Sequence, residues 1–121
     1  MQLPETWLGI LALIILVGAM MGGVVTAFLR LTDKDISIDT GLLHGRAGVA
    51  GVLLLLLVVF LGNEISPSMK PALGLFMLTA MGGVVLYFII RRKGIMPKTI
   101  IFAHGALAVA ALAILLFGVP F

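Results

Sequence analysis

Apolar residues run along this chain in four long, nearly uninterrupted stretches, separated by short segments that hold most of the charge. The stretches cover about residues 7–29, 42–62, 71–90 and 99–118. Each is close to the roughly 20 residues that a helix needs to cross the hydrocarbon core of a bilayer. Because backbone polar groups in lipid must bond within their own segment, the stretches are predicted to be helices. The pattern predicts an all-α integral membrane protein with four transmembrane helices.

Composition supports a lipid environment. The chain is 62% hydrophobic and 11% charged, whereas soluble domains are about a quarter charged. The first stretch does not resemble a cleavable signal peptide, because no basic residue precedes it and Glu5 lies in its flank. The absence of cysteine excludes disulfides, iron–sulfur clusters and thiolate metal sites. We expect residues 1–121 to form a single transmembrane domain.

The basic residues predict an orientation. One lies in the connection between the second and third stretches, Lys70, and seven flank the other two connections: Arg30, Lys34, Arg46, Arg91, Arg92, Lys93 and Lys98. Because Lys and Arg near span ends stay on the cytoplasmic side, those two loops are predicted to be cytoplasmic and both termini outside. We expect a bacterial inner membrane. Topology alone accounts for the basic excess, so no nucleic-acid partner is predicted.

The chain contains a tandem repeat. A shift of 60 positions aligns MGGVV at 21–25 with MGGVV at 81–85, and aligns His44 with His104. The first repeat covers about residues 7–62 and the second about 71–118. Since each repeat is a two-helix hairpin, both enter the membrane in the same direction, as parallel repeats do. The prediction is an antiparallel four-helix bundle of two hairpins related by a pseudo-two-fold axis along the membrane normal.

Symmetry then places the two histidines at equal depth, each on the second helix of its hairpin. Positions four and seven residues further along share the histidine's face, and all four are small: Gly48, Gly51, Ala108 and Ala111. Small residues at these positions leave room for a flat macrocycle whose central atom is bound by the histidine. The glycine pairs of the other two helices lie at about the same depth: Gly22, Gly23, Gly82 and Gly83.

These features predict one haem b with His44 and His104 as its axial iron ligands, in the cytoplasmic half of the bundle. Arg30 and Arg91, with Lys98, are the candidate partners of the propionates. Arg46 lies on another face of its helix and is expected to reach the membrane interface. The predicted role is electron transfer with a quinone or partner redox subunits, in contact with membrane lipid, and enzymatic activity is left open.

Other interpretations stay open. The first is a cofactor-free structural subunit whose histidines bond to carbonyls, with the glycines serving helix packing. The second is a metal or proton permease, disfavoured because the spans contain almost no polar residues at mid-membrane. Four methionines are interpreted as packing residues although thioethers bind Cu(I): Met20, Met21, Met77 and Met81. In the first loop, Asp39 or Thr40 is expected to cap the second helix.

The run GGVVTAFLRLTDKDISIDTGLLHGRAGVAGVLLLLL resembles the hairpins of haem A synthases, in which a Gly-containing helix is followed by a loop and a helix with a haem-ligating histidine near its start. More loosely, the chain resembles other small four-helix b-type membrane cytochromes with internal repeats. The similarity covers residues 12–62 and 72–118 and implies ligand positions at His44 and His104. The chain is about half the size of a haem A synthase and lacks the further histidines and the cysteine pair of its catalytic half, so a haem-modifying activity is not implied.

Overall fold

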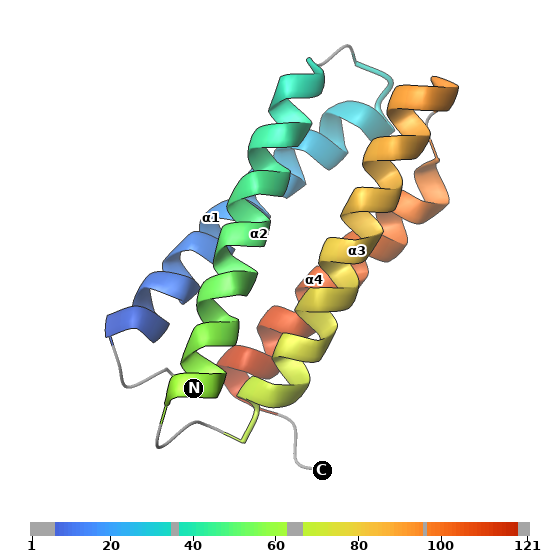
Figure 1. Cartoon of the computed structure of the whole chain (residues 1–121). Helices are drawn as coiled ribbons and strands as arrows, with labels where there is room; N and C mark the ends of the chain where they lie inside the picture. Colours follow the sequence, from blue (N-terminus) through green and yellow to red (C-terminus); the bar gives the residue numbers. More distant parts are fainter. Residues whose placement is uncertain (1–6, 35–36, 63–66, 96, 119–121) are drawn as a thin grey trace.

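The computed structural model describes residues 7–34, 37–62, 67–95 and 97–118, and these form four helices without strands. The helices are α1 (Trp7–Leu31), α2 (Ile38–Leu61), α3 (Met69–Lys93) and α4 (Lys98–Phe117) (Figure 1). Each is long and apolar enough to cross a membrane. The prediction of an all-α, four-helix membrane protein is confirmed.

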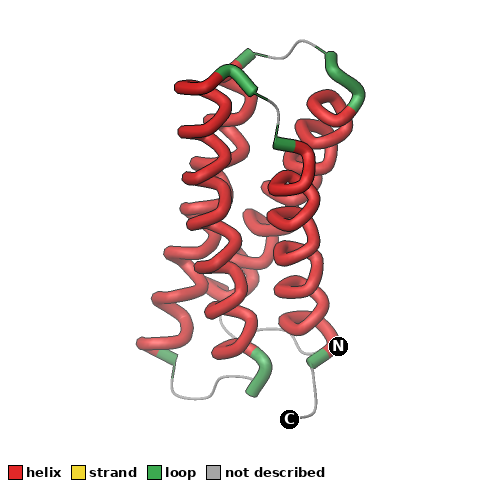
Figure 2. The backbone as a smooth tube through the Cα atoms, turned by 90° about the vertical axis from the view of Figure 1, so that its right-hand side faces the viewer, coloured by secondary structure: helices red, strands yellow, loops and turns green. Residues whose placement is uncertain are grey.

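The helices pack as two antiparallel hairpins. The closest packing joins α1 to α2 and α3 to α4, α2 also packs on α3, and α1 and α4 touch least. Within the described residues no close backbone approach joins α2 with α4, so these two helices lie diagonally across the bundle. The connections between α1 and α2 and between α3 and α4 lie together at one end, the upper end in Figures 1 and 2. We call it the basic end, because seven of the eight Lys and Arg residues lie in or near its two loops.

Local sequence explains where the helices start and stop. The α2 helix begins at Ile38, four residues before its apolar stretch, because the Ser37 hydroxyl accepts a hydrogen bond from the Asp39 N–H at 3.1 Å. The prediction that Asp39 or Thr40 is the cap was wrong, since both lie inside the first turn. The α3 helix ends before Gly94, whose φ of 65° is left-handed and therefore suits glycine.

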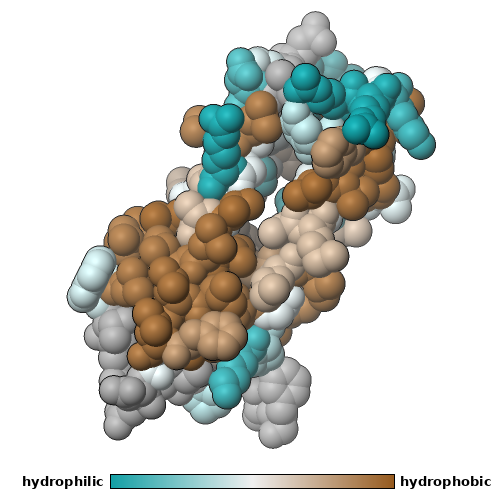
Figure 3. Space-filling model, viewed as in Figure 1, coloured by the Kyte–Doolittle hydropathy of each residue, from teal (hydrophilic) through white to brown (hydrophobic). Residues whose placement is uncertain are grey.

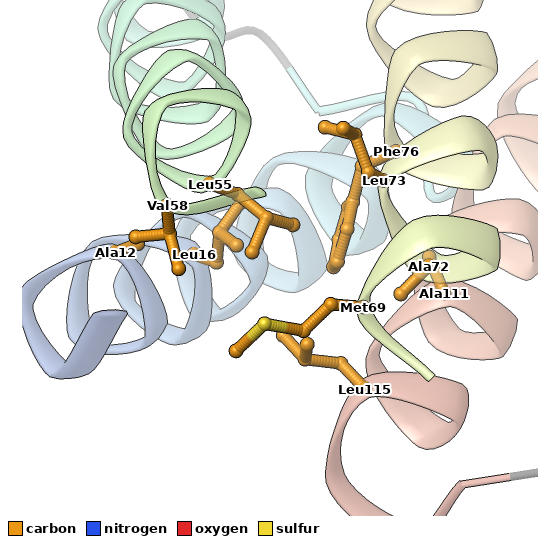
Figure 4. Close-up of a cluster of buried hydrophobic side chains, with 10 residues drawn as sticks. All are labelled: Ala12, Leu16, Leu55, Val58, Met69, Ala72, Leu73, Phe76, Ala111 and Leu115. Atoms are coloured by element: carbon orange, nitrogen blue, oxygen red, sulfur yellow. The ribbon is translucent and has the colours of Figure 1, made fainter. Parts of the chain in front are cut away.

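The apolar core lies in the half of the bundle away from the basic end, where side chains from all four helices meet (Figure 4). Its burial follows the 60-residue repeat. Ala12 and Ala72 are both 0% exposed, and Leu55 and Leu115 are both 1% exposed. At a third equivalent pair, Leu16 is 2% and Phe76 3% exposed. The two hairpins therefore bury equivalent faces against each other, as parallel repeats should.

The outer surface suits a bilayer. Large apolar side chains are exposed on the flanks of all four helices, among them Val24, Phe60, Met81 and Phe102. Figure 3 shows this apolar surface along the bundle and polar side chains gathered at the basic end. Membrane lipid is the environment that such a surface requires.

Candidate functional site

The two histidines of the chain meet inside the basic half of the bundle. His44 comes from α2 and His104 from α4, the diagonal pair of helices, and both side chains are partly buried. Their ring centroids are 6.1 Å apart and their planes are 87° apart. One imidazole from each hairpin thus reaches the centre of the bundle.

The His44 ring is seated against α1. Its Nδ1 lies 2.8 Å from the backbone carbonyl oxygen of Ala19. Because a carbonyl can only accept, Nδ1 is the donor, and Nε2 keeps its lone pair. A Cβ placed on Gly23 would lie 2.7 Å from Cε1 of this ring, closer than real Cβ atoms approach. Gly23 therefore gives the imidazole its place between the two helices.

The His104 ring has an equivalent but looser seat on α3. A Cβ placed on Gly83 would lie 3.2 Å from Cε1, and one placed on Gly82 would lie 3.5 Å from Nδ1. Thr79, sixty residues after Ala19, is the equivalent position on α3. Nδ1 of His104 is nevertheless buried without a hydrogen bond in the described part of the chain. Of the two imidazoles, His44 is the more firmly oriented.

The remaining small residues divide into open and packed positions. A Cβ on Gly22 or Gly48 would meet no atom within 4 Å, although both glycines are partly buried. A Cβ on Gly51 would lie 2.7 Å from Cδ2 of Leu16, and Ala111 is fully buried in the apolar core. The open face beyond His44 therefore extends to Gly48 and stops before Gly51. Ala108, on α4, is partly buried at the level of Gly48 in the repeat.

The three basic candidates occupy different surroundings. Arg30 is 9% exposed and lies against the first turn of α2. Arg91 is exposed and donates from Nη1 to the Tyr87 hydroxyl at 2.6 Å. Lys98 is exposed, and its Nζ lies 3.2 Å from a carboxylate oxygen of Asp33, joining the two hairpins at the basic end. Arg30 is the one of the three that is buried in the bundle.

Sequence reasoning missed the groups that hold the rings. The Ala19 carbonyl and the side chain of Leu16 decide what lies beside His44 and Gly51. A backbone carbonyl carries no signal in a sequence. The only available signal was spacing, since Ala19 and Thr79 each precede a ring-seating glycine by four residues and share its helix face.

Comparisons with models of protein families, with curated proteins and with solved structures find no match. The class of protein is therefore defined by its fold and its site alone. The chain is a four-helix membrane protein with one imidazole from each of two repeated hairpins at its centre.

Proposed function

We propose that this protein is a b-type cytochrome subunit that binds one haem b between His44 and His104 and exchanges electrons with a quinone or partner redox subunits. The observation that carries the proposal is the separation of the two rings. Two imidazoles bound to one metal through nitrogens about 2.0–2.1 Å from it have centroids roughly 6 Å apart. The centroids of His44 and His104 are 6.1 Å apart.

The donor set favours haem over a bare metal ion. The described residues bring together no group of three or more His, Cys, Asp or Glu side chains. Zinc sites take three or four protein ligands, whereas a haem iron takes only its axial ligands from the protein. Two imidazoles satisfy the second requirement and not the first.

The surroundings of His44 also fit a ligand role. A metal-bound histidine usually donates its other ring N–H to a carbonyl or carboxylate, which fixes the ring and its tautomer. The bond from Nδ1 of His44 to the Ala19 carbonyl has this form and leaves Nε2 for the metal. His104 occupies the equivalent position in the second repeat, and its Nδ1 is buried without a hydrogen-bond partner among the described residues.

The protein would hold such a group at a defined depth. A Cβ on Gly22 or Gly48 would meet no atom within 4 Å, and Leu16 and Phe76 are buried in the apolar core beyond the rings. A bound haem supplies one-electron exchange, while the chain sets its position and potential. From the positive-inside rule we expect this site in the cytoplasmic half of the membrane, which we expect to be a bacterial inner membrane. A single site on one side requires a partner to move electrons across the bilayer.

The test is a reduced-minus-oxidised optical spectrum of protein purified from haem-sufficient cells. We expect b-type bands at one haem per chain, lost or sharply weakened in His44→Ala and in His104→Ala. Gly105→Ala is the matched control, since it neighbours His104 and a Cβ there would meet no atom within 4 Å. Wild-type protein without haem bands would refute the proposal and favour a cofactor-free structural subunit.

A further inference from the structure

Arg30 places a cation inside the interface between α1 and α2. The residue is 9% exposed, and a Cβ on Gly41 would lie 3.6 Å from its Nη2. Gly41 precedes His44 by three residues, a rise of about 4.5 Å along α2. On α1, Arg30 follows the ring-seating Gly23 by seven residues and so shares its face. The guanidinium therefore lies about one turn from the imidazole site, toward the basic end.

The second hairpin shows that the fold does not need a cation here. The positions equivalent to Arg30 and Gly41 are Ile90 and Ile101, and Ile101 is 7% exposed. One repeat thus fills this position with two apolar side chains, while the other keeps a cation beside a glycine. A buried charge is costly unless it is paired. The cation therefore requires a reason other than packing.

The described residues give Arg30 no partner. Their only ion pair is Lys98 with Asp33, at the surface. No hydrogen bond joins the Arg30 guanidinium to another described residue. Arg30 is 9% exposed, so the residue is not fully enclosed by the helices around it. A planar guanidinium binds carboxylates through two parallel hydrogen bonds.

We propose that Arg30 binds a carboxylate of the molecule held by the two imidazoles, namely one propionate of the haem. This inference rests on the proposed function. It directs the propionate edge of the ring toward the basic end and anchors one propionate to the first hairpin. Ile90 offers the other propionate no equivalent donor. Arg91, exposed and bonded to Tyr87, takes no part.

The experiment measures haem affinity for variants of the full chain in detergent or lipid nanodiscs. The variants are Arg30→Gln, Arg30→Ile and Arg30→Lys, with Arg91→Gln as the matched control. A charge-assisted hydrogen bond contributes about 1.5–3 kcal/mol, so Arg30→Gln and Arg30→Ile should weaken haem binding roughly 10- to 150-fold. Arg30→Lys should lose less, and Arg91→Gln should match wild type. Arg30→Ile copies the second repeat and should keep its helical circular dichroism.

A second probe, haem b dimethyl ester, separates the carboxylate contact from other effects. Wild type should bind the ester about as weakly as Arg30→Gln binds haem, and Arg30→Gln should cause little further loss with the ester. If Arg30→Gln binds haem as wild type does, or weakens both probes equally, the inference is overturned while the haem site stands. An effect of Arg30→Gln that appears only in nanodiscs containing anionic lipid would assign the cation to a lipid phosphate and also overturn it. Wild type without haem bands refutes the proposed function itself.

Discussion

Replacing Gly23 by alanine should displace the His44 ring. The new Cβ would lie 2.7 Å from Cε1 and 3.3 Å from both ring nitrogens, against the roughly 3.5–4.0 Å of an ordinary carbon contact. Overpacking of this kind costs about 1–3 kcal/mol, and loss of the bond to the Ala19 carbonyl adds about 1 kcal/mol. The better helix propensity of alanine recovers up to about 1 kcal/mol. The free energy of unfolding should fall by about 1–3 kcal/mol.

Two other glycines serve as comparisons for the expected loss of stability at Gly23. At Gly83 the added Cβ would lie 3.2 Å from Cε1 of His104, so a ring movement of a few tenths of an ångström relieves the contact, and the loss should stay below about 1 kcal/mol. At Gly18, on the same helix as Gly23, the Cβ would meet nothing within 4 Å. The expected order of stability is Gly18→Ala first, then Gly83→Ala, then Gly23→Ala.

The assay is reversible unfolding in mixed micelles, paired with a haem titration followed by absorbance. The ¹⁵N signal of His44 Nδ1 in histidine-labelled protein reports directly on its bond to Ala19. If Gly23→Ala unfolds like Gly18→Ala and keeps the bonded Nδ1 signal, the ring does not occupy the seat described, and the reasoning fails.

Three further predictions concern other contacts. Lys98→Gln should change the free energy of unfolding by at most about 1 kcal/mol, and by less at high salt, because both partners of its ion pair with Asp33 are exposed. A larger loss in unfolding titrations would contradict this. Gly51→Ala should lower stability by about 1–3 kcal/mol through contact with Leu16, and Leu16→Ala in the same chain should restore part of it; simple additivity of the two changes would contradict the contact. Ferric protein with haem bound should give a strongly anisotropic low-spin electron paramagnetic resonance signal, because imidazole planes 87° apart act on different iron d orbitals. The rhombic signal that is typical of parallel planes would instead show that the rings turn on binding.

The spans and the repeat could be predicted from sequence because lipid leaves the backbone little choice. Four apolar stretches of the right length became four helices, and the 60-residue shift reappears in the burial of Ala12 with Ala72 and Leu55 with Leu115. The start of α2 was less predictable, because several polar residues compete to cap it and the fold selects Ser37. Such a choice depends on the path of the loop.

The meeting of the two histidines could be predicted from the sequence, and the surroundings of the glycines could be predicted less well. The repeat singled out both histidines, and the structure brings their rings together. Periodicity gave the helix face on which each glycine lies, but not the group that faces it. Gly23 accommodates an imidazole and Gly51 accommodates Leu16, because side chains of neighbouring helices fill those spaces. That information belongs to the packing of two helices and not to either sequence alone.

The two ends of the bundle differ in how closely side chains pack, although both are made from the same repeated unit. Away from the basic end, equivalent apolar side chains such as Leu16 and Phe76 meet and close the core. Toward the basic end, Gly22 and Gly48 are partly buried yet face space that no side chain fills. Helices in lipid gain no hydrophobic stabilisation from touching each other and depend on packing and polar contacts. The bond from His44 on α2 to the Ala19 carbonyl on α1 is such a polar contact, and it lies in the half of the bundle where the apolar core does not extend.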